Sequence, residues 1–207
     1  MLYIDVDAVS KLAHWNVLPL LPEITGLPWS SMSSVSSLKH RAHRAIERLD
    51  GKLFRSAEAA ATAKNALVQM PEAPEPAPDL LAALAGYPDI DSGEAILLAL
   101  TAQAEDAFLL TGDKRALRRL AQTPLSGRFA GRILLVEQVL MRCLKNPGRL
   151  WLLANVCPHR EIDKAISICL GSACDASAAN IEMGLGSYIA EINALSDPSF
   201  LRAMEAE

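Results

Sequence analysis

The sequence predicts an α/β domain with a parallel sheet, followed by a helical extension. Short apolar runs with β-branched members, at 2–6, 107–110 and 133–136, have the composition of strands that are buried on both faces. Longer stretches with helical spacing separate these runs. Strands that alternate with helices form right-handed βαβ units, with helices on both sides of the sheet, which makes three layers. We therefore expect the α/β domain over 1–145 and the helical extension over 146–207.

Caps and prolines place the elements of the first half of the chain. Ser10 is an acceptable cap for a helix that ends before Pro22, and four prolines within 71–79 break regular structure and mark a surface connection. A second short strand is expected within 28–34. The helices expected in this half lie at about 10–20, 36–49, 56–70 and 80–85.

The second half of the chain has clearer signals for the ends of its helices and strands. Ser92 is expected to cap a strong helix, and the segment between the two later strand runs is basic and has helical spacing. Pro147 and Gly148 interrupt the chain, and no convincing strand follows them. The expected helices lie at about 93–104, 114–121 and 137–145 in the domain, and at 149–155, 159–170, 177–194 and 198–204 in the extension.

Composition and charge limit the classes of function. A chain of 207 residues with 51% apolar content can bury a substantial core. Its net charge of −4 gives no overall attraction for nucleic acid, so any contact with nucleic acid must be local. No run approaches the roughly 18 apolar residues of a membrane span. Residues 1–20 carry two aspartates where a signal peptide would be basic and then apolar, so we expect a cytoplasmic protein without a membrane partner.

The cysteines do not form a recognisable metal motif. Cys143, Cys157, Cys169 and Cys174 show no Cys-x-x-Cys spacing. A zinc set that includes His159 is disfavoured, because structural zinc sites normally use tighter paired spacings. Buried free thiols in a reducing compartment are the better interpretation.

Three acidic residues are placed to meet at one edge of the predicted sheet. Asp5 ends the first strand, Asp113 follows the strand that ends near Thr111, and Glu94 lies in the first turn of a helix that enters from Asp91. In a parallel sheet, ligands bind outside the carboxyl ends of the strands. Carboxylates gathered within ~4 to 6 Å repel one another unless a cation neutralises them. Mg²⁺ or Mn²⁺ suits such ligands, and metal-assisted phosphodiester hydrolysis is the predicted chemistry, with Thr111 orienting a carboxylate or a water.

Each of these acids also has an ordinary structural role. Asp113 can cap the helix over 114–121, and Glu94 near a helix N-terminus is favourable with the helix dipole whatever its function. Asp5 is harder to explain in this way, because an ionised carboxylate at the end of a buried strand needs a partner. The joint placement of the three acids favours the functional interpretation.

Three segments, in order, resemble motifs of the PIN domain family. Residues 3–12 (YIDVDAVSKL) resemble the opening of PIN domains, where a strand ends in Asp and a helix begins. Residues 91–96 (DSGEAI) resemble the family's Asp-x-Gly-Glu-Ala element, and residues 109–117 (LLTGDKRAL) are similar to its Thr-x-Asp element after the fourth strand. The resemblance covers roughly residues 1–140.

The resemblance implies a metal-dependent endoribonuclease that hydrolyses RNA phosphodiester bonds on a five-stranded parallel sheet, with Mg²⁺ or Mn²⁺ in the site. Many relatives are toxins of toxin–antitoxin pairs and form dimers, so the implied partners are RNA, an antitoxin or other protein, and a second copy. The implied catalytic residues are Asp5, Asp91, Glu94 and Asp113, of which Asp5, Glu94 and Asp113 bind the metal, supported by Thr111 and Asp7.

The chain departs from the family pattern in two places. Family members commonly carry another acid on the helix after the second strand, where this chain has Lys39. Asp91 is the first choice to compensate, ahead of Asp7 and Glu137. A catalytically degenerate PIN-like module that binds RNA or a protein partner is therefore the alternative. The second departure is the tail of about 60 residues, which is expected to form a dimer surface, to cover the site or to bind a partner.

Two basic clusters are candidate phosphate contacts. The residues singled out are Lys39 and Arg41 in the first cluster and Lys114 and Arg115 beside the predicted metal. Solvated helix faces are the alternative for both clusters. Trp15 and Trp29 are expected to pack in the interior rather than to stack on bases. A nucleotide-handling α/β enzyme is disfavoured, because neither a GxGxxG motif nor a P-loop follows the first strand.

Overall fold

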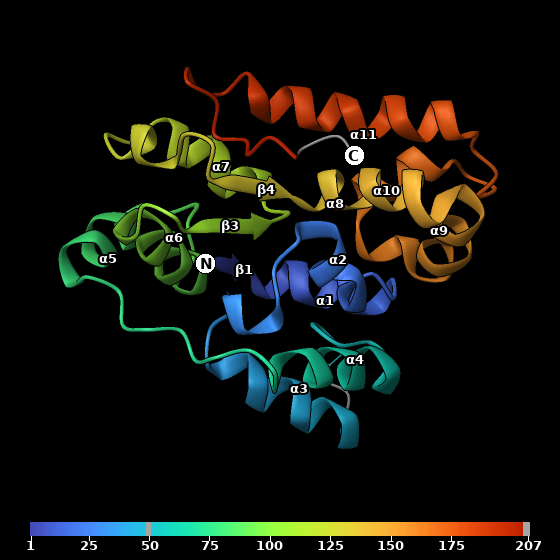
Figure 1. The fold of residues 1–207 in the computed structure, drawn as a ribbon, viewed down its shortest axis with the longest axis horizontal. Coiled ribbons are helices and arrows are strands. Elements are labelled where there is room, and N and C mark those ends of the chain that lie inside the picture. The colour runs from blue at the N-terminus through green and yellow to red at the C-terminus, as the bar shows by residue number, and fades with distance from the viewer. Residues whose placement is uncertain (49–50, 205–207) are drawn as a thin grey trace.

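The computed structural model, which describes residues 1–48 and 51–204, contains a four-stranded sheet in the order β2-β1-β3-β4 with every pair parallel (Figure 1). The strands are β1 (Leu2–Ile4), β2 (Met32–Ser33), β3 (Phe108–Thr111) and β4 (Ile133–Leu135). All of their residues are buried, as expected for a sheet covered on both faces. The predicted α/β class with a parallel sheet is confirmed.

Helices surround this sheet. In the first part of the chain they are α1 (Val6–His14), α2 (Leu21–Thr25), α3 (Ser37–Glu47), α4 (Ala57–Leu67), α5 (Pro78–Ala85), α6 (Ser92–Gln103) and α7 (Lys114–Ala121), with 3-10 turns at Leu18–Leu20, Trp29–Ser31 and Ser126–Phe129. After β4 come α8 (Val136–Cys143), a π turn (Leu144–Gly148), α9 (Arg149–Val156), a 3-10 turn (Cys157–Ile162), α10 (Lys164–Leu170) and α11 (Ala178–Asn193).

The register of the strands defines two faces of the sheet. Side chains alternate along a strand, so Leu109 and Thr111 share one face and Phe108 and Leu110 share the other. Tyr3 pairs with Leu109, which puts Tyr3 and the following Asp5 on the face of Leu109 and Thr111. This alternation decides which side chains can meet at the carboxyl edge of the sheet.

Three predicted helix starts differ clearly from the structure. The helix expected over 159–170 begins only at Lys164, because a 3-10 turn occupies Cys157–Ile162. Helix α1 begins at Val6 rather than at Ser10, with Asp5 in the extended conformation of an N-cap, and Asn16 at φ 57° ends the helical path before Pro22. Ser10 lies inside this helix, where its hydroxyl donates to the carbonyl of Leu53. Helix α6 is capped by Asp91 and not by Ser92: Asp91 has the extended backbone of an N-cap, and its carboxylate accepts from the third amide of the helix, whereas Ser92 is already the first helical residue.

The last described segment is extended, so the helix expected over 198–204 is wrong. Leu201 forms a parallel bridge with Ile133, whose amide donates to the carbonyl of Phe200 (2.9 Å) and whose carbonyl accepts from the amide of Arg202 (2.8 Å). Strand β4 is an edge strand, so one side of its backbone has no partner among the described strands. The segment around Leu201 forms hydrogen bonds with this side, and the side chain of Phe200 is fully buried. Among the described residues the sheet has four strands and this bridge, not five strands.

The extension after residue 145 packs against the rest of the chain. Helix α11 contacts α8 and α7, and it lies along the top of Figure 1 above β4. The indole of Trp15, which is fully buried as predicted, donates to the carbonyl of His159 (3.1 Å). Trp29, also expected inside, is half-buried. The boundary drawn between 1–145 and 146–207 stays a prediction.

A disulfide joins Cys157 and Cys174, so the expectation of four free thiols is wrong for this pair. Their Cα atoms lie 6.1 Å apart because the chain turns back around α10, a closeness that the spacing of the cysteines does not reveal. Cys143 and Cys169 are free and buried, as expected. Because a disulfide does not indicate a reducing compartment, Cys157 and Cys174 no longer support that inference.

Candidate functional site

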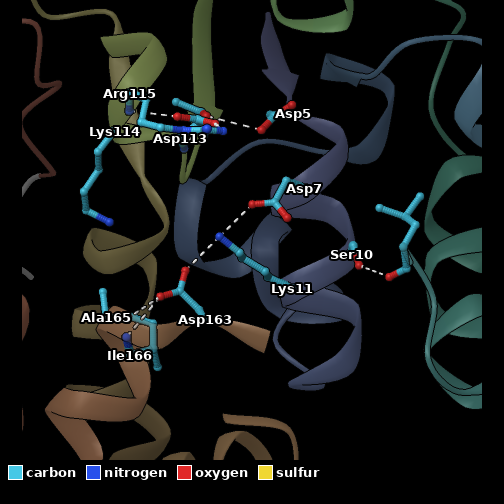
Figure 2. Close-up of polar contacts among 12 residues, drawn as sticks. Asp5, Asp7, Ser10, Lys11, Asp113, Lys114, Arg115, Asp163, Ala165 and Ile166 are labelled. Atoms are coloured by element: carbon cyan, nitrogen blue, oxygen red, sulfur yellow. Dashed lines mark hydrogen bonds and ion pairs between the residues drawn. The ribbon is translucent and has the colours of Figure 1, made fainter. Parts of the chain in front are cut away.

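Asp5 lies at the carboxyl end of β1, and its residue surface is only 6% exposed. Its amide continues the strand pairing by donating to the carbonyl of Leu110 (2.9 Å). The hydroxyl of Thr111, at the end of the neighbouring strand, donates to Oδ2 of Asp5 (3.3 Å). Figure 2 shows the Asp5 side chain directed toward this strand end rather than into α1. The carboxylate therefore faces the edge where β1 and β3 stop.

Asp91 and Glu94 form a capping box at the start of α6. The amide of Glu94 donates to Oδ1 of Asp91 (2.8 Å), and the amide of Asp91 donates to Oε2 of Glu94 (2.7 Å). These bonds satisfy two amides of the first turn, which have no partner within the helix. The ordinary structural role of Glu94 is confirmed. Within the described residues the second oxygen of each carboxylate carries no hydrogen bond.

Asp113 caps α7, as its ordinary interpretation predicted. Its Oδ1 accepts from the amides of Arg115 (2.8 Å) and Ala116 (3.1 Å), and its own amide donates to the hydroxyl of Thr111 (3.0 Å). Its Oδ2 accepts from the guanidinium of Arg115 at 3.3 Å. Thr111 therefore connects the positions of Asp5 and Asp113.

Asp5 and Glu94 line the same small cavity, although they are distant in sequence. The cavity has a volume of about 10 Å³, which is room for one water-sized species. Its remaining walls come from β3, α6 and α7: Leu97, Leu98, Leu109, Thr111, Ala116 and Leu117. The structure thus brings Asp5 and Glu94 together in an apolar surrounding.

The environment of this cavity opposes negative charge. Burial, followed by the charges of Asp7 and Asp91, raises the pKa of Asp5 to about 7. Burial also raises the pKa of Glu94 to about 7, with Asp113, Asp91 and Asp5 adding like charge. Burial is the largest cause of both shifts, and the like charge of neighbouring acids adds to it.

The pKa of Asp113 moves the other way. Burial raises it, but the hydrogen bonds from the amides of Ala116 and Arg115 and the guanidinium of Arg115 outweigh burial, so the pKa of Asp113 is lowered. Asp113 is thus the acid that stays ionised most readily. Two protonatable acids next to one ionised acid give the site a charge that varies near neutral pH.

The donor chemistry of the site fits a hard divalent ion. Asp5, Glu94, Asp91 and Asp113 supply only carboxylate oxygens, the ligands that Mg²⁺ and Mn²⁺ prefer. Within residues 1–48 and 51–204, no three acid, histidine or cysteine side chains already meet as a metal-binding group. The capping bonds hold Asp91, Glu94 and Asp113 at their helix starts. A metal ion would be bound by the carboxylate oxygens that accept no hydrogen bond from a capped amide.

Asp7, predicted to support the site, instead pairs with Lys11. Nζ of Lys11 lies 2.6 Å from a carboxylate oxygen of Asp7 and 2.7 Å from one of Asp163, the N-cap of α10 (Figure 2). A Cβ at Gly112 would lie 3.3 Å from this Nζ, so the ammonium packs directly against the turn between Thr111 and Asp113. Sequence reasoning missed Lys11 and Asp163. The spacing of Asp7 and Lys11, one helical turn, was the available signal.

The predicted phosphate contacts have different surroundings. Lys39 donates to the carbonyl of Met70 (3.0 Å), and Lys114 pairs with buried Glu137 and lies over the ring of Tyr188. Arg115 is exposed beside Asp113. Arg41 is half-buried on α3. Their contact with RNA stays a prediction.

No family model, curated protein or solved structure matches this chain. The PIN assignment therefore rests on the three motifs and on the geometry given above. Over the described part of the chain, no helix combines the length and the apolar character needed to cross a membrane.

Proposed function

We propose that this chain is a PIN-type, metal-dependent endoribonuclease that hydrolyses RNA phosphodiester bonds. The observation that carries the proposal is that Asp5 and Glu94, from different motifs, face one cavity and both have a pKa of about 7. Crowded acids of this kind are stabilised by a divalent cation. Under this proposal the partners are RNA and, as in toxin-type PIN domains, an antitoxin or a second copy of the chain.

Each residue has a defined task in the proposed reaction. A bound Mg²⁺ or Mn²⁺ would supply an activated water and neutralise charge on the phosphate. Asp5, Glu94 and Asp113 would hold the ion, and Asp91 would assist from the start of α6. Thr111 fixes the carboxylate of Asp5 through its hydroxyl. The exposed guanidinium of Arg115, beside Asp113, would bind a phosphate oxygen.

An RNA cleavage assay tests this proposal. The purified chain is expected to cleave RNA with Mg²⁺ or Mn²⁺ and not with EDTA. Asp5→Asn and Asp113→Asn should each lower the rate by about 100-fold or more, since even outer-shell partners of a metal cost 10- to 100-fold. Glu105→Gln removes an exposed acid outside the site and should cleave normally. Full activity of Asp113→Asn would overturn the proposal.

The second candidate is a PIN-like module that binds RNA or a protein without cleaving. It is favoured by the caps that occupy Asp91, Glu94 and Asp113, and by Lys39 at the position of a family acid. The two candidates differ in their response to metal. The enzyme should show a Mn²⁺-dependent rise in melting temperature, whereas a module without a metal site should show none.

A further inference from the structure

A second cavity lies away from the acidic site and has a different character. Its volume is about 650 Å³, within the range of small-molecule sites. Its floor includes Phe108 and Leu134, which are buried in β3 and β4. Leu134 pairs with Leu110, and Leu110 shares its face with Phe108, so this floor lies on the sheet face opposite to Thr111 and Asp5.

Positive charge gathers around this cavity. The described residues that line it include three cations, Arg142, Lys145 and Arg202, and one carboxylate, Glu23. Among them this leaves an excess of two positive charges, in a chain whose net charge is −4. Across residues 1–48 and 51–204, no acidic side chain forms an ion pair with any of the three cations. Other arginines, such as the exposed Arg118 and the half-buried Arg119, do have acidic partners. The cavity therefore concentrates cations that form no ion pair within the described part of the chain.

The guanidinium of Arg202 is held in place by an aromatic ring. It lies over Phe108, 4.3 Å from the ring centroid. The backbone of the same residue is fixed, because its amide donates to the carbonyl of Ile133 (2.8 Å). A guanidinium stacked in this way keeps its edges free to donate two parallel hydrogen bonds to an oxyanion.

Apolar side chains form another part of the wall. Ile24 and Leu27, from α2 and the loop after it, line the cavity together with Met204. A cavity lined by both charged and apolar side chains suits a ligand that has one charged end and one apolar body. A phosphate monoester, with about two negative charges at neutral pH, matches the excess of two positive charges better than a single carboxylate does.

We propose that this cavity is a binding site for a small phosphate monoester with a planar or apolar body. The phosphate lies among Arg142, Lys145 and Arg202, and the body packs on the half-buried Ile24 and Leu27. The site needs no metal and lies on the other face of the sheet from the acids. It therefore goes beyond the proposed nuclease function and does not depend on it.

Calorimetric titration in EDTA, with AMP and phenyl phosphate as probes, tests this site. Both should bind with a Kd below about 1 mM, and inorganic phosphate and adenosine should each bind at least about tenfold more weakly, since each supplies only half of the contacts. Equal binding of inorganic phosphate, or of adenosine, would overturn the proposal. So would the absence of binding by both probes.

Substitutions that each remove one positive charge show where AMP binds. Arg142→Gln and Arg202→Gln should each weaken binding of AMP by about tenfold or more, because each removes a charged hydrogen bond to the phosphate. Arg128→Gln removes a cation outside the cavity that is exposed like Arg202, and this variant should bind AMP as the wild type does. An equal loss in Arg128→Gln would show nonspecific attraction and overturn the proposal. Asp5→Asn should bind AMP normally, whereas a loss there would place the nucleotide at the acidic site.

Discussion

Asp5 combines two properties that rarely occur together in a side chain with only a structural role. It is buried at the end of a strand, and its hydrogen-bond donors are the amide of Val6 and the hydroxyl of Thr111 rather than a cation. Burial and the charges of Asp7 and Asp91 outweigh these two hydrogen bonds and raise its pKa to about 7. Asp113 has amide donors and Arg115 beside it, so its pKa is lowered. The pKa values of Asp5 and Asp113 thus shift in opposite directions because their hydrogen-bond donors differ.

Asp5→Asn tests the cost of this burial. The pKa of Asp5 is about 7 in the folded state against an ordinary value of 3.8, so between these two pH values the folded state binds one proton more than the unfolded state. Stability should fall as pH rises from about 4 to 7 and then level off. Asp5→Asn should be more stable than the wild type by roughly 2 to 4 kcal/mol at about pH 8 in EDTA, and equal to it near pH 4. Urea unfolding at both pH values measures this difference.

Glu94 shifts in the same direction, so part of the slope with pH should persist in Asp5→Asn. The exposed Glu105→Gln serves as the control and should keep the whole slope. An unchanged slope in Asp5→Asn would show that Asp5 is ionised in the fold at neutral pH, contrary to our account.

Residue roles near the sheet edge were partly predictable. Asp5, Glu94 and Thr111 could be placed because a strand end and a helix start are local features, and the structure puts all three at one cavity. The second partner of Lys11 could not be predicted, because Asp163 caps a helix that is distant in sequence. Ion pairs across such distances depend on packing that no local pattern encodes.

The ion pair between Lys11 and Asp163 joins α1 to α10, and both side chains are largely buried. Asp163→Asn should lower the free energy of unfolding by about 2 kcal/mol, because it removes a charged hydrogen bond while an Asn can still cap α10. Lys11 lowers the pKa of Asp163, together with the amide of Ile166, against the opposing effect of burial. The contribution should therefore be present above pH 4 and be lost as pH falls below it.

Thermal or urea unfolding across this pH range measures the effect. Glu161→Gln is the matched control, because Glu161 forms only an exposed pair with Arg55 at 3.7 Å and should change stability by less than about 0.5 kcal/mol. Equal effects of the two substitutions would contradict a special contribution of the buried pair.

The start of α6 shows that two neighbouring residues can both be candidates for one helix cap. Both Asp91 and Ser92 are residues that cap helices, and only the structure shows that Asp91 makes the box with Glu94. Asp91→Ala should lower the free energy of unfolding by about 1 kcal/mol. Ser92→Ala should change it by less than about 0.5 kcal/mol, as for an ordinary surface position. A larger loss in Ser92→Ala, measured by urea unfolding, would contradict the assigned cap.

Most elements were predictable because prolines, caps and strand runs are local signals. The helix expected over 198–204 failed for a tertiary reason: the open edge of β4 pairs with Leu201 and its neighbours. The choice between helix and extended chain in so short a segment is decided by what lies beside it.

At the scale of the whole molecule, the extension is tied to the rest of the chain by several different contacts. Asp163 binds Lys11, the carbonyl of His159 accepts from Trp15, and residues 199–202 pair with β4. The parallel sheet was predictable from the alternation of strands and helices. The disulfide and the path of the last segment were not, because both depend on how the extension folds back.

The disulfide between Cys157 and Cys174 gives a prediction at this scale. The two cysteines are separated by 17 positions, and in the chain-entropy estimate a loop of about this size contributes about 3 kcal/mol. Dithiothreitol should therefore lower the melting temperature of the wild type. Cys174→Ser should melt at the lower temperature and show no response to dithiothreitol. If dithiothreitol left the melting temperature of the wild type unchanged, this would contradict a stabilising role for the disulfide.

The central claim is that Asp5 and Glu94 share a divalent ion. Calorimetric titration of Mn²⁺ at pH 7, in two buffers of different ionisation enthalpy, tests it most directly. With pKa values of about 7, both acids are partly protonated, so binding of Mn²⁺ should release protons, and Asp5→Asn should abolish the binding. Absence of Mn²⁺ binding at about millimolar metal, or equal binding by Asp5→Asn, would contradict the account.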